Sequence, residues 1–235
     1  MMLEMRTGDL VKLPGLLLST VMLFAAQAHA ATAQHLVVVE LFTSQGCSSC
    51  PPANESLRAI ADRTDVLALS FDVTYWDYLG WKDIFDNEFY TQRQRDYEAP
   101  LGEAGPFTPQ IVVDGARDTV GDDYGALEQL VVASHRTDTP AIALTANSVT
   151  VGSGSGAADV WLVRYDPRLQ HVPVARGENA GYTLTQRNVV RALSRIGGWN
   201  GQAIQFTIPA APAGLKTAVL LQRPRGGAIL TAARD

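Results

Sequence analysis

The sequence has few cysteines, few histidines and few charged residues. Only two of its 235 residues are cysteines, four are histidines and 18% are charged. All thiol or disulfide chemistry within one chain therefore depends on Cys47 and Cys50. A zinc site usually needs four protein ligands, and none of the histidines after residue 30 has ligand spacing to these cysteines. We expect no metal site and no cofactor, and keep a copper site of two thiolates and one histidine as an alternative.

Long apolar runs are also scarce, and the single clear one lies near the N-terminus. Leu13 to Ala26 is apolar and uncharged, and it is followed by the cleavage pattern Ala28-His29-Ala30. This order is typical of a secretory signal peptide covering residues 1–30. We therefore expect an exported protein, periplasmic or extracellular, with no stable membrane insertion. Export and a net charge of −5 argue against nucleic acid as a partner.

The charge of the remaining chain changes sign near residue 139. Residues 35–138 carry 18 acidic and 7 basic side chains, whereas residues 139–235 carry 4 acidic and 10 basic ones. The pattern of hydrophobic residues changes at the same place. We therefore predict two domains after the signal peptide, one over residues 31–138 and one over residues 139–235.

The first of these regions alternates between strand-like and helix-like patterns. Continuous apolar runs predict buried strands at 36–42 and 66–73, and an Asp-Gly turn joins strands at 110–115 and 117–121. Helices are predicted at 53–62, 87–99 and 122–136. The order β-α-β-α-β-β-α indicates a layered α/β sheet.

The second region predicts a small, mostly-β domain resembling a sandwich. Its short strands lie near residues 141–151, 159–165, 171–176, 203–208, 217–222 and 228–233. Residues 183–199 fit either a helix or a strand, and their β surroundings favour a strand.

The motif "GCSSCPP" joins the first strand to the first helix. A C-x-x-C at such a junction in an α/β unit is typical of a thioredoxin-like redox site. The helix start presents unpaired N–H groups and a positive dipole potential, which lower the pKa of the first cysteine. We predict that Cys47 is the nucleophile and that Cys50 resolves the mixed disulfide.

A second motif, Thr108-Pro109, precedes the third strand. In thioredoxin-like folds a cis proline at this place faces the cysteine pair and helps an extended substrate to pair with the backbone. The position carries this argument, because X-Pro bonds are cis in only about 5–6% of cases. We therefore assign Thr108 and Pro109 to a substrate groove.

Several motifs together resemble one family over nearly the whole mature chain. "VVELFTSQGCSSCPP", "YWDYLGWKDIF", "FTPQIVVDG" and "WLVRYDPRLQHVPVARGENAGYTLTQRNVVRAL" are similar to secreted bacterial proteins grouped as domain of unknown function 1223. The resemblance implies a thioredoxin-like N-terminal domain and a C-terminal β domain of the family's own. Family members usually have an acid where this chain has Asn54.

Glu40 lies among apolar residues of the first strand, seven positions before Cys47. Thioredoxins carry a buried acid at a similar place, which relays protons for the resolving cysteine. A proton relay is therefore one role for Glu40, and a structural or rim carboxylate is the other. The aromatic side chains at 72–83 also have two possible roles. They pack over the sheet, which we favour, or they form the wall of a groove beside the cysteines.

The sequence thus predicts a secreted thiol–disulfide oxidoreductase acting on exported proteins or small thiols. Such an enzyme needs a redox partner to recycle its cysteine pair. The alternative is a binding module on a thioredoxin scaffold, with Cys47 and Cys50 as a permanent structural disulfide. A loop this short constrains the unfolded chain only weakly, so a purely structural disulfide would stabilise the fold little.

Overall fold

A computed structural model describes residues 36–134 and 139–235. The predicted signal peptide at residues 1–30 lies outside the described residues. Residues Ala33–Asp235 form one compact unit. Among the described residues, no helix combines the length and apolar character needed to cross a membrane.

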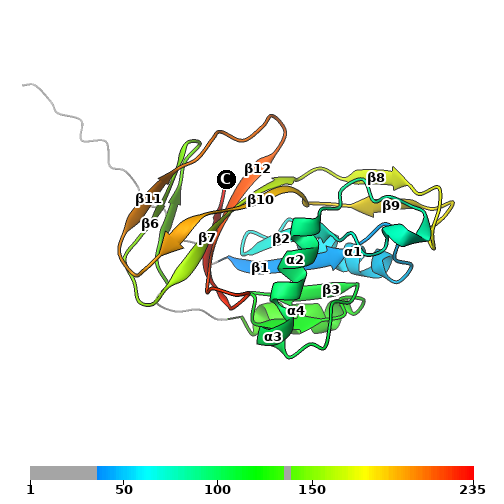
Figure 1. Ribbon diagram of the computed structural model, residues 1–235, viewed down its shortest axis with the longest axis horizontal. Coiled ribbons are helices and arrows are strands. Elements are labelled where there is room, and N and C mark those ends of the chain that lie inside the picture. The colour runs from blue at the N-terminus through cyan, green and yellow to red at the C-terminus, as the bar shows by residue number, and fades with distance from the viewer. Residues whose placement is uncertain (1–35, 135–138) are drawn as a thin grey trace, which may run out of the picture. The chain divides into compact units, whose positions relative to one another are not determined.

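The largest sheet of the described residues has eight strands (Figure 1). In spatial order they are β13 (Ile229–Arg234), β12 (Lys216–Gln222), β7 (Ala158–Asp166), β10 (Val189–Trp199), β2 (Val66–Asp72), β1 (Val37–Thr43), β3 (Gln110–Val113) and β4 (Arg117–Thr119). β1 and β2 are parallel, and their apolar runs are buried on both faces, as expected for central strands.

Helices cover both faces of the β1–β2–β3 part of this sheet. The helices are α1 (Cys50–Ile60), α2 (Glu88–Asp96), α3 (Glu98–Leu101) and α4 (Tyr124–Val132), with a short 3-10 turn η1 (Asp77–Leu79). Val39 and Leu41 share a core with α1 and α4, whereas Val38 and Phe42 share a different core with α2. The alternation along β1 therefore assigns each side chain to one of two opposite layers.

The other end of the large sheet packs against a three-stranded sheet. This second sheet consists of β11 (Ile204–Thr207), β6 (Ser148–Val151) and β5 (Ile142–Leu144). Val149 and Val151 of β6 share a core with Val160 of β7 and Val219 of β12. The region after residue 139 is thus mostly strand, and residues 183–199 are strand as expected.

The large sheet joins strands from both sides of residue 138. β10 lies beside β2, with Val189 opposite Ser70. The side chain of Asn188 donates to the Ala68 carbonyl at 2.8 Å, and Ser70 N–H donates to the Asn188 carbonyl at 3.0 Å. The acidic and basic regions of the sequence therefore share one sheet.

The order β-α-β-α-β-β-α predicted for the first region is present, with different helix ends. The predicted helix at 87–99 is divided at Tyr97 into α2 and α3, and the helix predicted from residue 53 already begins at Cys50. The Asp114-Gly115 turn between β3 and β4 has positive φ at both residues, as a type I′ hairpin turn requires.

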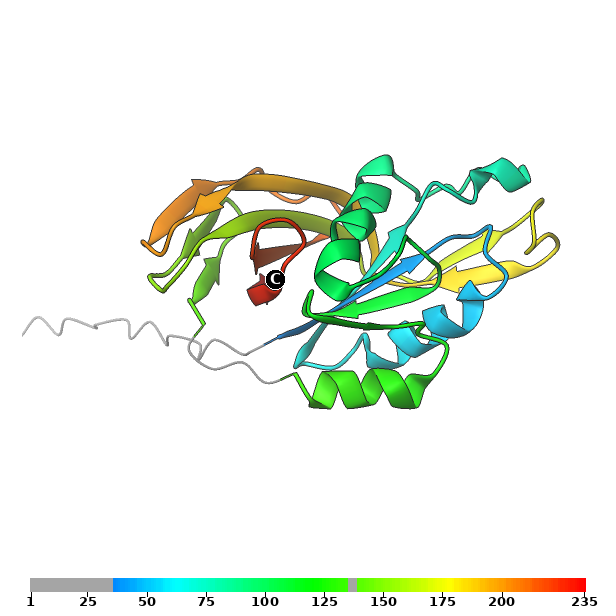
Figure 2. The same cartoon turned by 60° about the horizontal axis from the view of Figure 1, so that its bottom comes forward.

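A hairpin of β8 (Gln170–Pro173) and β9 (Thr183–Gln186) leaves the large sheet between β7 and β10. Figures 1 and 2 show it extending along the end of the α/β layers where α1 begins. We call residues 174–182, which connect its strands, the hairpin loop. This placement brings a segment from the second half of the sequence to the cysteine motif.

Candidate functional site

The cysteine pair forms a disulfide at the start of α1. Cys47 and Cys50 are bonded with their Cα atoms 5.5 Å apart. We call residues 44–49, between β1 and α1, the cysteine loop. Its turns are closed by Cys47 N–H donating to the Ser44 carbonyl and Cys50 N–H donating to the Cys47 carbonyl, both at 3.2 Å. Both cysteines are buried, with 0% and 1% exposure, while Ser48 and Ser49 between them are exposed.

Trp76 connects the cysteine loop with Thr108 and Pro109. A Cβ atom at Gly46 would lie 3.1 Å from Trp76 Cβ, so the glycine permits a close approach of the loop to this residue. The indole Nε1 of Trp76 donates to Thr108 Oγ1 at 2.7 Å. The Thr108–Pro109 peptide bond is cis. The structure therefore brings both predicted motifs together around one aromatic side chain.

Gln45 joins the cysteine loop to three other segments. Its N–H donates to Asp83 Oδ2 at 2.7 Å, and its side-chain oxygen accepts from Trp81 Nε1 at 3.0 Å. Its side-chain nitrogen donates to Gln186 Oε1 at 3.3 Å, and Gln186 in turn donates to Asp72 Oδ1 at 2.5 Å. Gln45 is therefore held directly by β9 and by the segment at 73–87, and it is linked to β2 through Gln186.

Two buried carboxyl groups lie beneath Gln45. Burial and, after it, the charge of Asp83 raise the pKa of Asp72 well above 3.8, and burial also raises the pKa of Asp83. In the part of the chain that the structure describes, Asp72 Oδ2 has no hydrogen-bond partner. Burial and the neighbouring charge therefore favour the neutral form of Asp72 beneath the cysteine loop.

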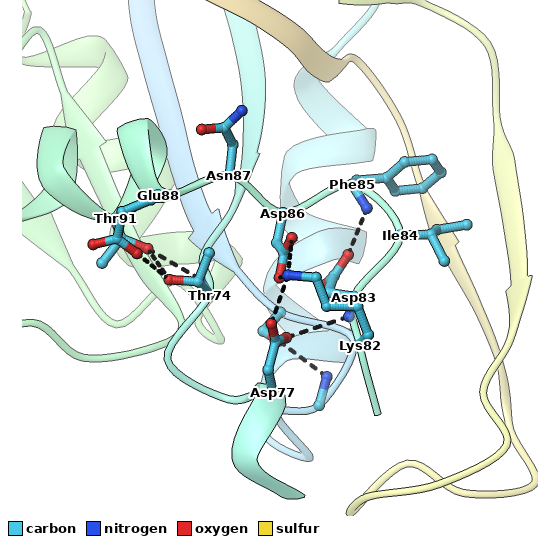
Figure 3. Close-up of polar contacts among 12 residues, drawn as sticks. Thr74, Asp77, Lys82, Asp83, Ile84, Phe85, Asp86, Asn87, Glu88 and Thr91 are labelled. Carbon is cyan, nitrogen blue, oxygen red and sulfur yellow. Dashed lines mark hydrogen bonds and ion pairs between the residues drawn. The ribbon is translucent and has the colours of Figure 1, made fainter. Parts of the chain in front are cut away.

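The 73–87 segment, which carries Trp76 and Trp81, is ordered by its own polar contacts (Figure 3). Lys82 Nζ donates to Asp77 and to Asp86, each at 2.7 Å, and Asp83 Oδ1 accepts from Phe85 N–H at 2.9 Å. Burial raises the pKa of Asp86 to about 6, although the Lys82 ammonium opposes this shift. These contacts hold the aromatic residues that surround the cysteine loop.

The hairpin loop contacts the cysteine loop directly. The buried Asn179 donates from Nδ2 to the carbonyls of Gln45 at 3.0 Å and of Cys47 at 2.8 Å. Glu178 Oε2 accepts from Ser48 N–H at 3.1 Å and from Ser48 Oγ at 2.6 Å. Sequence analysis gave neither residue a role, although both lie in "ARGENAGY", within a motif that carried the family resemblance.

Glu40 lies away from the disulfide. Its side chain shares a face of β1 with Val38 and Phe42, opposite the face that α1 covers. One carboxylate oxygen accepts from Arg93 Nε at 2.7 Å, and the other accepts from the hydroxyl of Tyr97. The structure does not bring Glu40 together with the cysteines, and these contacts favour the structural role over the proton relay.

Asn54 fixes the first turn of α1. Its Nδ2 donates to the Cys50 carbonyl at 3.1 Å and to Thr43 Oγ1 at 3.0 Å. The amide thus ties Cys50 to the end of β1. The amide N–H groups of Asn54 donate both of these hydrogen bonds. An ionised carboxylate has no hydrogens to donate and could not make them.

The described residues around the cysteines do not form a metal-binding group. His171 is exposed and hydrogen-bonds Thr185 Oγ1 at 3.0 Å, while His35 and His135 lie outside the described residues. Within residues 36–134 and 139–235, no group of three or more cysteine, histidine or acidic side chains is arranged to hold a metal ion. The copper alternative thus has no third ligand in the described chain.

The fold and this site define a sheet-rich mixed α/β protein with a disulfide at a strand–helix junction. The chain belongs to the family described as protein of unknown function DUF1223, whose model matches residues 38–222. An X-ray crystal structure of a protein from Agrobacterium tumefaciens is similar, with 33% identity and a TM-score of 0.69, covering 84% of this chain and 92% of that one. HBP35 of Porphyromonas gingivalis shares 13% identity and a TM-score of 0.60, covering 86% of this chain and 75% of that one, which indicates a similar fold alone. No curated protein matches the chain.

Proposed function

We propose that the protein is an exported thiol–disulfide oxidoreductase on a thioredoxin-like scaffold. The observation that carries the proposal is the Cys47–Cys50 disulfide at the start of α1, linked through Trp76 to the cis Thr108–Pro109 peptide. The order of strands and helices over residues 36–134 agrees with such a scaffold. Export through a signal peptide at residues 1–30 agrees with a disulfide, because oxidising compartments preserve disulfides.

The chemistry is a two-step exchange between dithiol and disulfide. In the reducing direction, the Cys47 thiolate attacks one sulfur of a substrate disulfide and the other substrate sulfur leaves as a thiolate. The Cys50 thiolate then attacks the Cys47 sulfur, restores the Cys47–Cys50 disulfide and releases the second substrate thiolate. Two electrons pass from the cysteine pair to the substrate, and an exported redox partner must return them. Oxidation of a substrate dithiol is the reverse sequence.

Thr108 and Pro109 line the place proposed for the substrate backbone. β3 begins at Gln110, and its partners β1 and β4 occupy both of its edges. An extended substrate therefore pairs with the residues before the strand rather than with the strand itself. The substrate class is an exported protein with an extended segment around its cysteine, or a small thiol.

One observation favours the alternative of a binding module with a structural disulfide. Both cysteines are buried in the oxidised state, so a substrate reaches Cys47 only after the surrounding loops move. A permanent disulfide needs no such movement. A reduced oxidoreductase forms a mixed disulfide with its substrate, whereas a binding module with a structural disulfide does not.

Trapping of a mixed disulfide separates these functions. The mature chain with Cys50→Ser should accumulate a covalent adduct with an exported protein or a small disulfide through Cys47, because the resolving thiol is gone. The matched variant Cys47→Ser should accumulate far less. Unaltered protein should catalyse insulin reduction or oxidative refolding, and the double serine variant should not. Equal, negligible trapping by both single variants and no catalysis would establish the structural disulfide instead.

A further inference from the structure

Few backbone N–H groups near Cys47 are free to donate to its sulfur. α1 begins with Cys50-Pro51-Pro52, and prolines have no N–H group. The Cys50 N–H is already bonded to the Cys47 carbonyl. The Ser48 N–H is bonded to the carboxylate of Glu178. A helix start normally stabilises a nearby thiolate through such donors, and here most of them are absent or engaged.

Glu178 is held in place although it is exposed. Its neighbour Asn179 is buried and donates to two carbonyls of the cysteine loop, which fixes the hairpin loop against residues 45–47. Gly177, with φ of 78°, lets the chain turn just before these two residues. The bonds from Ser48 lower the pKa of the Glu178 carboxyl below 4.5, so the group is ionised at neutral pH.

We propose that Glu178 lowers the reduction potential of the Cys47–Cys50 pair, so that the hairpin loop is part of the active site and the pair works as a reductant. This inference rests on the proposed function, because it assigns the direction of that exchange. A fixed negative charge bonded to Ser48 destabilises a thiolate on the adjacent Cys47. Because a stabilised thiolate favours the reduced form, destabilising it favours the disulfide and makes the dithiol a stronger reductant.

Substitution of Glu178 tests the charge separately from the hydrogen bonds. Glu178→Gln keeps an oxygen that accepts from Ser48 but removes the charge, and Glu178→Lys reverses the charge. The control is Glu55→Gln, which removes one charge from an exposed acid on α1 whose ion partner is Arg58 at 3.5 Å. Each purified mature protein is equilibrated in glutathione redox buffers at pH 8, and the fraction of dithiol is read by alkylation of the free thiols.

The expected result is a graded shift toward the dithiol. Glu178→Gln should change the equilibrium at least threefold, which is about 14 mV for a two-electron couple, and Glu178→Lys should change it further in the same direction. Glu55→Gln should change it less than twofold. Equilibrium constants for both Glu178 variants within twofold of that of the unaltered protein would overturn the inference.

The inference and the proposed function fail in different ways. If the unaltered protein catalyses exchange but the Glu178 variants keep its potential, only the role of Glu178 is wrong. If the potentials shift as expected but no variant traps or reduces a substrate, the electrostatic role stands and the enzymatic function is wrong. Circular dichroism detects whether Glu178→Gln unfolds. In that case the Ser48→Ala variant, which keeps the carboxylate, should retain the original potential. A threefold shift of its equilibrium toward the dithiol would overturn the inference.

Discussion

Replacing Glu40 by glutamine removes one charge from an ion pair that is buried inside the large sheet. Glu40 is 0% exposed and Arg93 is 5% exposed, with 2.7 Å between the carboxylate and Nε. The Arg93 guanidinium would keep its charge, its bond to Gln222 Oε1 at 3.1 Å and its stacking over Trp161 at 5.5 Å. Losing one partner of a buried pair typically costs about 3–5 kcal/mol, because the other charge is left uncompensated.

The assay is equilibrium unfolding in guanidinium chloride, with the free energy of unfolding extrapolated to water. We expect Glu40→Gln to lose about 3 kcal/mol or more. Arg93→Met should lose a similar amount, because it leaves a buried carboxylate bonded only to Tyr97. The double variant should lose less than the sum of the two single losses, because it removes both charges.

A result near zero for Glu40→Gln would refute the reasoning, since it would mean that the buried Arg93 guanidinium loses no free energy when its charged partner is removed. The same variant tests the proton relay. Per folded molecule, its rate of thiol–disulfide exchange should equal that of the unaltered protein. A loss of exchange without a loss of stability would restore Glu40 to the catalytic role.

Two further changes follow from the cysteine loop. Asp72→Asn should flatten the dependence of stability on pH. In the unaltered protein the raised pKa of Asp72 means that the folded state keeps a proton that the unfolded state loses. Its stability therefore falls as pH rises above about 4. Thermal unfolding between pH 4 and pH 8 measures this, and an unchanged slope would contradict the assignment. Gly46→Ala should destabilise the protein by about 1–3 kcal/mol, because a Cβ there lies 3.1 Å from Trp76 Cβ. An unchanged midpoint of denaturation would contradict this prediction, because it would show that Trp76 shifts without a loss of stability.

Local patterns were sufficient to predict most elements. The apolar runs of β1 and β2 are buried on both faces, as their composition indicates, and the Asp114-Gly115 turn carries its own conformational signal. The strands over residues 183–199 agree with the β surroundings that favoured a strand over a helix there. These features depend on neighbours within a few residues, which is the range over which a sequence period can be read.

Contacts between distant segments could not be predicted in the same way. The pairing of β10 with β2 rests on residues more than one hundred positions apart. Glu178 and Ser48 are 130 positions apart, and no local period marks either as part of a site. Glu40 was recognised as an unusual acid among apolar residues, but no sequence pattern connected it with its partner Arg93, 53 positions away. Polar side chains find such partners through the tertiary fold. The sequence therefore predicted the cysteine pair and the Thr108-Pro109 motif but not the contacts from Glu178 and Asn179.

The reduction potential of the Cys47–Cys50 pair tests the central claim most directly. Catalytic pairs lie between about −270 and −120 mV, whereas structural disulfides typically lie below about −300 mV. With prolines at the start of α1 and Glu178 bonded to Ser48, we expect a value in the lower part of the catalytic range, near that of a reductant. A value below about −300 mV would contradict the account and identify a permanent structural disulfide.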